Sequence, residues 1–120
     1  MRLRLLDLDG ALDQQAVIAQ AVAHGMMTRI EARDLGKDLR LVASRKAFGD
    51  LQNRLRASLA DGQGPCVTFY GSGDFHHVTT ALIGLCEGPL TVLHFDNHPD
   101  WVTFPKTHNC GAWVNRALEL

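Results

Sequence analysis

The sequence has few of the features that mark secreted, membrane or nucleic-acid-binding proteins. Its three cysteines, Cys66, Cys86 and Cys110, form no C-x-x-C pair and are odd in number, which favours a reduced cytoplasm. A net charge of -1 offers no attraction for nucleic acid or an anionic membrane. We find no signal peptide and no apolar run near the ~20 residues of a membrane span. We therefore expect a cytoplasmic protein with neither of these partners.

What the chain does contain is the pattern of one α/β domain over residues 1–120. At 120 residues, 46% hydrophobic and 21% charged, its composition is ordinary for a globular protein, and no linker or repeat divides it. Periodicity and turn residues predict strands at 2–9, 66–70 and 90–95, and helices at 13–23, 28–35, 45–60, 78–86 and from about 112. This order favours a small parallel sheet between helices, a three-layer sandwich.

Several helix boundaries follow from capping residues. Asp13 is predicted to cap the first helix, and Thr28 with Glu31 has the spacing of a capping box. Ser44 is predicted to cap the helix that follows it, and Gly36 to stop the helix before it. The stretch 38–43 fits a strand or a helix equally well.

Three potential metal ligands follow the predicted strand at 90–95. Asp96, His98 and Asp100 stand at spacing two, so an extended backbone would send them to one side. Pro99 favours that backbone at His98. Two carboxylates and an imidazole suit a divalent ion such as Mn, Mg or Zn, although the same residue types also form ordinary turns. His94, inside the predicted strand, is interpreted as structural.

A second polar stretch follows the strand at 66–70. It reads Gly-Ser-Gly-Asp-Phe-His-His over 71–77 and leads into a helix. In an open α/β sheet, ligands bind beyond the carboxyl ends of strands, which is where both stretches place their polar residues. A lone histidine pair is more often a satisfied polar pair, so the metal hypothesis depends on the two stretches together.

These two stretches resemble the first two metal motifs of the arginase and agmatinase (ureohydrolase) superfamily. Asp96, His98 and Asp100 match its Asp-x-His-x-Asp motif. Its Gly-Gly-Asp-His motif is matched with one extra residue, which makes His76 the better ligand candidate and His77 the alternative. The resemblance implies two manganese ions that share Asp96, with His76 and Asp100 on one ion and His98 on the other. A single-zinc deacylase that uses Asp96 and His98 is a variant within the same superfamily.

A third similarity lies at Asn109–Val114, where the family often has a His-Gly pair beside the substrate. Cys110 occupies that place here, and His108, two residues earlier, is the candidate replacement for the family's histidine in proton transfer. The resemblance therefore implies a hydrolase that uses metal-activated water to cleave a C–N bond in a small-molecule substrate, a guanidino compound or an amide.

The chain departs most from the family in length. The family takes its last two carboxylates from an Asp-x-Asp motif on a later strand, in chains at least about twice as long. We therefore expect the amino-terminal part of an arginase-like domain, an incomplete half of the fold, or a reduced relative that binds metal weakly or not at all. A non-catalytic role in assembly is one alternative. Because a three-stranded sheet leaves open edges, we also expect association with another copy, as a homo-oligomer, or with further sequence of the same protein.

A rival function comes from the end of the first strand. Asp7-Leu8-Asp9-Gly10 resembles the Asp-x-Asp-Gly loop of haloacid-dehalogenase-like phosphatases, in which the first Asp is the nucleophile and the second a general acid. The motif is short, and a strand that ends in Asp-Gly is more often a turn. We find no matching downstream lysine and acidic pair, so this hypothesis ranks second.

Overall fold

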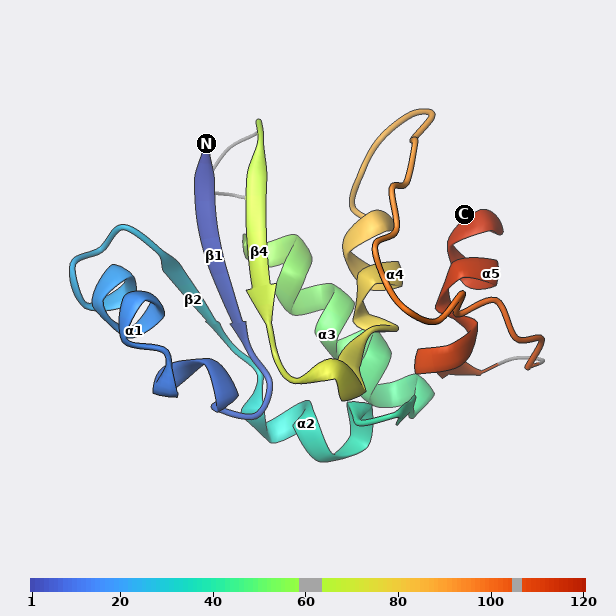
Figure 1. The fold of residues 1–120 in the computed structure, drawn as a ribbon, viewed down its shortest axis with the longest axis horizontal. Helices are drawn as coiled ribbons and strands as arrows, with labels where there is room; N and C mark the ends of the chain where they lie inside the picture. The colour runs from blue at the N-terminus through green and yellow to red at the C-terminus, as the bar shows by residue number, and fades with distance from the viewer. Residues whose placement is uncertain (59–63, 105–106) are drawn as a thin grey trace.

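The structure is a computed structural model that describes residues 1–58, 64–104 and 107–120. Three parallel strands form its sheet, in the order β2-β1-β4 (Figure 1). The central strand β1 (Arg2–Asp7) pairs with β2 (Thr28–Glu31) and with β4 (Cys66–Tyr70). Since all three strands run in one direction, their carboxyl ends lie at one edge, as the sequence predicts for a small parallel sheet.

The remaining elements are mostly short. The helical ones are η1 (Ala11–Gln14), α1 (Ala16–Ala23), α2 (Arg33–Leu39), α3 (Arg45–Ser58), η3 (Gly73–Phe75), α4 (Val78–Ile83), η4 (Cys110–Ala112) and α5 (Trp113–Leu118). Two further strands, β3 (Val42–Ala43) and β5 (His108–Asn109), pair antiparallel as a separate ribbon. No helix among the described residues is long and apolar enough to cross a membrane.

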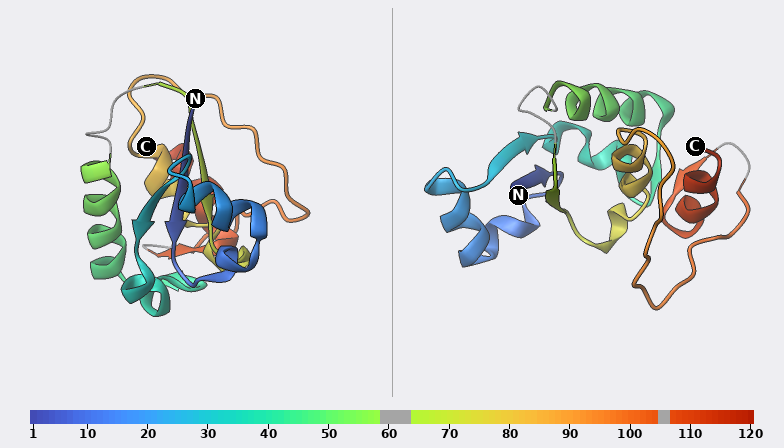
Figure 2. Two further views of the ribbon diagram at one scale, coloured as in Figure 1. Left: turned by 90° about the vertical axis from the view of Figure 1, so that its left-hand side faces the viewer. Right: turned by 90° about the horizontal axis from the view of Figure 1, so that it is seen from above.

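Successive side chains of β1 point to opposite faces of the sheet, so the core is divided into two apolar clusters, one on each face. Leu5 packs with Ile18 and Ala21 of α1, whereas Leu6 belongs to the larger cluster with α2, α3 and α4. The two views of Figure 2 place α1 and α3 on opposite sides of the strands. Helices therefore cover both faces of β1, as in the three layers expected from the sequence.

Helix α3 is the element that the sequence predicted best. The Ser44 hydroxyl accepts a hydrogen bond from the Ala47 N–H at 3.2 Å, so Ser44 caps the helix. Phe48, Leu51 and Leu55 are buried on one face at helical spacing, as predicted. The predicted end of this helix at Ala60 and most of the following loop at 61–64 lie outside the described residues.

Two predictions near the amino terminus are wrong. Thr28 and Glu31 do not cap a helix but bound β2, because Ile30 between them is buried in the core and the backbone pairs with β1. Asp13 lies in η1 and caps no helix; its carboxylate instead pairs with Arg29 and Arg33. Helix α1 accordingly begins later than predicted, at Ala16.

The predicted strand at 90–95 is also wrong. This stretch has no helix or strand and lies beside α4 and α5 instead of in the sheet (Figure 1). Leu90 and Val92 line a cavity against these helices, whereas Leu93 and Phe95 are 75% and 92% exposed. The edge of β4 that faces away from β1 is unpaired in the described part of the chain.

Gly36 does not end α2 but lies inside it, buried against the chain that follows β1. A Cβ added there would lie 2.1 Å from the Leu8 carbonyl oxygen, so only glycine permits this approach. The helix continues to Leu39, and the ambiguous stretch 38–43 divides between the end of α2 and strand β3.

We expect Gly36→Ala to destabilise the protein by about 1 to 3 kcal/mol, because the added methyl group overlaps backbone that cannot move cheaply. Gly49→Ala is the matched control: Gly49 lies in α3 with nothing within 4 Å of its added Cβ. That change should stabilise by roughly 0.5 to 1 kcal/mol through helix propensity. Urea unfolding measures the free energy of unfolding of both variants. Equal changes in the two variants would contradict the close packing of Gly36 on the Leu8 carbonyl.

Candidate metal centre

The loop between β4 and α4 brings His76 to the carboxyl edge of the sheet. Gly71 turns the chain with φ +29°, and a Cβ there would lie 2.6 Å from the Phe75 ring. The Ser72 N–H donates to the Asp9 carboxylate at 3.3 Å, which attaches the loop to the end of β1. His76 follows η3 directly, with its side chain 36% exposed.

Helix α5 holds Asp100 in place through two hydrogen bonds. The Trp113 indole N–H donates to Asp100 Oδ2 at 2.9 Å, and the Val114 N–H donates to the Asp100 carbonyl at 3.1 Å. Asp100 adopts φ +50°, a left-handed conformation that Asp tolerates better than most residues. Its side chain is only 7% exposed, so these contacts fix a nearly buried carboxylate.

His76, Asp96 and Asp100 converge on one point. Each offers one ligand atom, and these three atoms lie within 4.8 Å of one another. His76 Nδ1 is 3.3 Å from Asp96 Oδ2 and 3.5 Å from Asp100 Oδ2. Two carboxylates this close repel each other unless a proton or cation lies between them, and the donor set suits a divalent ion. The residues therefore fit the first ion that the resemblance implies.

His98 lies on the other side of Asp96. Its Nδ1 is 3.6 Å from Asp96 Oδ1, whereas His76 faces Oδ2 of the same carboxylate. The backbone N–H of His98 also donates to Oδ1 at 3.0 Å, and this bond is the main reason that the pKa of Asp96 lies below its usual value. Asp96 thus presents one oxygen to each histidine, although the His98 side chain is 80% exposed.

Sequence reasoning missed two residues of this site. His94, interpreted as structural, has its Nε2 3.6 Å from Asp100 Oδ2 and 3.8 Å from Asp96 Oδ2. Trp113, which donates to Asp100, also meets the His94 ring edge to face at a centroid distance of 4.9 Å. The signal for His94 was its spacing of two from Asp96, which equals the spacing within the motif itself.

His77, the alternative ligand, is turned away from the carboxylates. Its side chain is fully buried, and its Nδ1 lies 3.3 Å from Cys110 Sγ. Burial is the main cause that lowers the pKa of His77 to about 4. Between the two histidines, the structure therefore brings His76 to the cluster.

The two candidates for proton transfer lie around His77. Cys110 donates its thiol proton to the Asp74 carbonyl at 2.9 Å, and burial raises its pKa. His108 stacks on Phe48 at 3.8 Å, and burial is the main cause of its lowered pKa. Both groups are therefore held neutral near pH 7, and in the described residues no ion pair or hydrogen bond joins them to the cluster carboxylates.

The aspartates of the rival phosphatase motif are engaged in other contacts. The Asp7 carboxylate pairs with Arg29 at 2.6 Å and Arg33 at 2.8 Å, and its side chain is 3% exposed. Asp9 accepts hydrogen bonds from the backbone of Ala11 and of the β4–α4 loop. A nucleophile must be open to its substrate, so this arrangement favours a structural role for Asp7.

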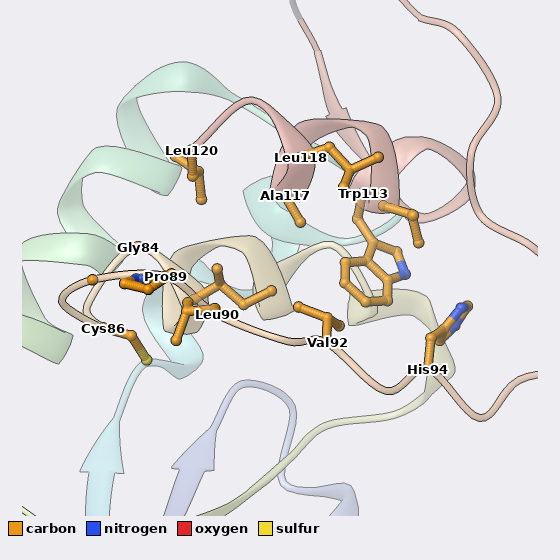
Figure 3. A pocket seen from close by; sticks show the side chains of 13 residues that line it. Gly84, Cys86, Pro89, Leu90, Val92, His94, Trp113, Ala117, Leu118 and Leu120 are labelled. Carbon is orange, nitrogen blue, oxygen red and sulfur yellow. The ribbon is translucent and has the colours of Figure 1, made fainter.

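An apolar cavity of about 590 Å³ adjoins the cluster. Figure 3 shows His94 and Trp113 at one end of it and Leu120 toward the other. Its remaining lining comes from α4, α5 and the stretch between Cys86 and Val92. Among the described residues that line it, none is an aspartate, glutamate, lysine or arginine, so this lining suits an apolar group.

Comparison with known proteins leaves the family open. The chain is 26% identical over 118 residues to an uncharacterized protein of Thermotoga maritima. That alignment covers 98% of this chain but 44% of the relative, so the chain spans less than half of the relative's length. No family model matches the chain, and no solved structure matches it.

We expect stability to fall as the pH drops from 6.5 to about 4, because His77 is neutral when buried but takes up a proton in the unfolded chain. The loss attributable to His77 is up to about 3 kcal/mol. The lowered pKa of His108 also reduces stability as the pH falls. The lowered pKa of Asp96 reduces stability only near and below 3.8, the ordinary pKa of an aspartate. Urea unfolding with a chelator present measures this, and His77→Gln should flatten the profile. An unchanged slope in that variant would contradict the assignment.

Proposed function

We propose that this chain carries the metal-binding part of an arginase-like hydrolase that cleaves C–N bonds in guanidino or amide substrates. One observation carries the proposal. His76 reaches the cluster from the edge of the sheet, and Asp96 and Asp100 reach it from a separate irregular segment, yet their ligand atoms lie within 4.8 Å. These are the residues that the resemblance assigns to the first of two manganese ions, with zinc as the other candidate metal.

The cluster supports a shared role for Asp96. Its Oδ2 faces His76 and its Oδ1 faces His98, which is the arrangement of a carboxylate between two ions. The first position has three ligand groups that are partly buried, whereas the second has Asp96 and the exposed His98. We therefore propose that the first ion binds tightly and the second weakly in this chain.

A divalent ion in such a site lowers the pKa of bound water and so supplies a nucleophile at neutral pH. The chain's own contribution is to hold the ligands and to shield the site. The apolar cavity beside His94 and Trp113 would take an apolar substituent of the small-molecule substrate and exclude water from that side. We place this activity in the cytoplasm, where all three cysteines, which are free in the structure, would stay reduced.

A second candidate is a non-catalytic role in assembly. Leu93, Phe95 and Trp101 are 63% to 92% exposed on the segment that holds the carboxylates. Exposed apolar side chains of this size favour an interface, and a homo-oligomer would bury them. Metal binding separates the two candidates, because assembly alone does not need an ion at the cluster.

The first test is metal content after incubation with Mn²⁺ or Zn²⁺ and gel filtration, measured by mass spectrometry. We expect about one tightly held ion per chain in the wild type. His76→Ala, Asp96→Ala and Asp100→Ala should each lose it, because each removes a ligand of the first ion. His98→Ala should retain it, since His98 faces the other oxygen of Asp96.

His24→Ala is the control, because His24 lies at the end of α1 and contacts Gln20 instead of the cluster. Wild-type protein without metal would overturn the proposed function and leave the assembly role. Metal-loaded protein should then be screened for release of urea or ammonia from guanidino and amide substrates.

A further inference from the structure

We propose that His94 is a fourth ligand of the first ion, so that this chain supplies two imidazoles and two carboxylates to one site. The inference rests on the proposed function, because it needs an ion at His76, Asp96 and Asp100. It goes beyond the resemblance, which assigns no ligand role to this position. With His94 as a ligand, the first ion would have four ligands from this chain. His94 would then replace the carboxylate that the family takes from a later strand.

The geometry places His94 on the same two oxygen atoms that His76 faces. Its Nε2 is 3.6 Å from Asp100 Oδ2 and 3.8 Å from Asp96 Oδ2. The corresponding separations of His76 Nδ1 are 3.5 Å and 3.3 Å. Ligand atoms at about 2.0 to 2.2 Å from one ion are roughly 3 to 3.5 Å apart, so all four separations match or slightly exceed those of neighbouring ligands.

Direct hydrogen bonding does not account for these separations. A ring N–H that donates to a carboxylate normally comes within about 2.7 to 3.2 Å of the oxygen. All four distances are longer than that, although both rings are close enough to shorten them by small rotations. His76, Asp96 and Asp100 already lie within 4.8 Å of one another, and His94 faces the same two carboxylate oxygens, so a rotation of its ring toward the ion would bring it into this group.

The His94 ring also packs against the Trp113 indole. It meets the Trp113 indole at an interplanar angle of 83° and a centroid distance of 4.9 Å. Trp113 is 4% exposed, and its N–H binds Asp100 Oδ2, so one buried side chain orients two proposed ligands. Such outer contacts orient ligands in metal sites, and this one links the ion to the apolar cavity that His94 lines.

The test is a Zn²⁺ titration of His94→Phe and His94→Ala by competition with a chelating dye. The Phe variant keeps an aromatic ring against Trp113 but removes the nitrogen, so it separates ligation from packing. We expect both variants to lose more than about 100-fold in affinity, since loss of outer-shell contacts alone costs 10- to 100-fold. His24→Ala should bind as the wild type does.

Affinity of His94→Phe within about threefold of the wild type, with binding lost in His76→Ala, would overturn the inference and leave the proposed function standing. Absence of zinc binding by the wild type would overturn both. X-ray absorption at the zinc edge of the wild type tests the same point without a variant, because it counts imidazole ligands. Two imidazoles per ion are expected, and one would overturn the role of His94.

Discussion

The buried hydrogen bond from Trp113 to Asp100 is the contact on which the candidate site depends. Residues 84–104 contain no helix or strand, so no ladder of backbone hydrogen bonds fixes their course. Trp113 and the two backbone bonds that join Val114 to Asp100 and Val102 to Gly111 attach this segment to η4 and α5. A carboxylate can be placed precisely by an irregular segment only when such contacts hold it.

The charges around the site differ from those elsewhere in the fold. Asp7, Asp13 and Asp34 are neutralised by arginine side chains, which carry their charge at any ordinary pH. Among the described residues, the ion pairs of Asp96 and Asp100 are with histidines alone. Two neighbouring carboxylates without an arginine or lysine partner favour a divalent cation between them, and imidazole nitrogens are suitable further ligands for such an ion.

Local signals in the sequence predicted the parts of the fold that local interactions determine. Ser44 caps α3 through one side-chain contact. The Asp-x-His-x-Asp spacing named Asp96 and Asp100 as candidate ligands, and the structure places both beside His76. Thr28 failed because its capping-box spacing also fits a β strand, and burial of Ile30 beside β1 decided between them. His94 carried one local signal, its spacing of two from Asp96, whereas Trp113 carried none, because its contacts with Asp100 and His94 join segments that are not neighbours in the chain.

The failure of the strand at 90–95 bears on how the site works. A strand needs a partner for its backbone, and here the segment lies beside α4 and α5 instead (Figure 1). Within the described residues, the edge of β4 that faces away from β1 has no partner, and Val67 and Phe69 are over one third exposed. Leu93 and Phe95 point to solvent directly beside His94 and Asp96. Any surface that covers these apolar side chains, including a second copy of the chain, therefore contacts the backbone that carries the candidate ligands. Association and metal affinity should be thermodynamically linked for that reason, because each favours the conformation that the other needs.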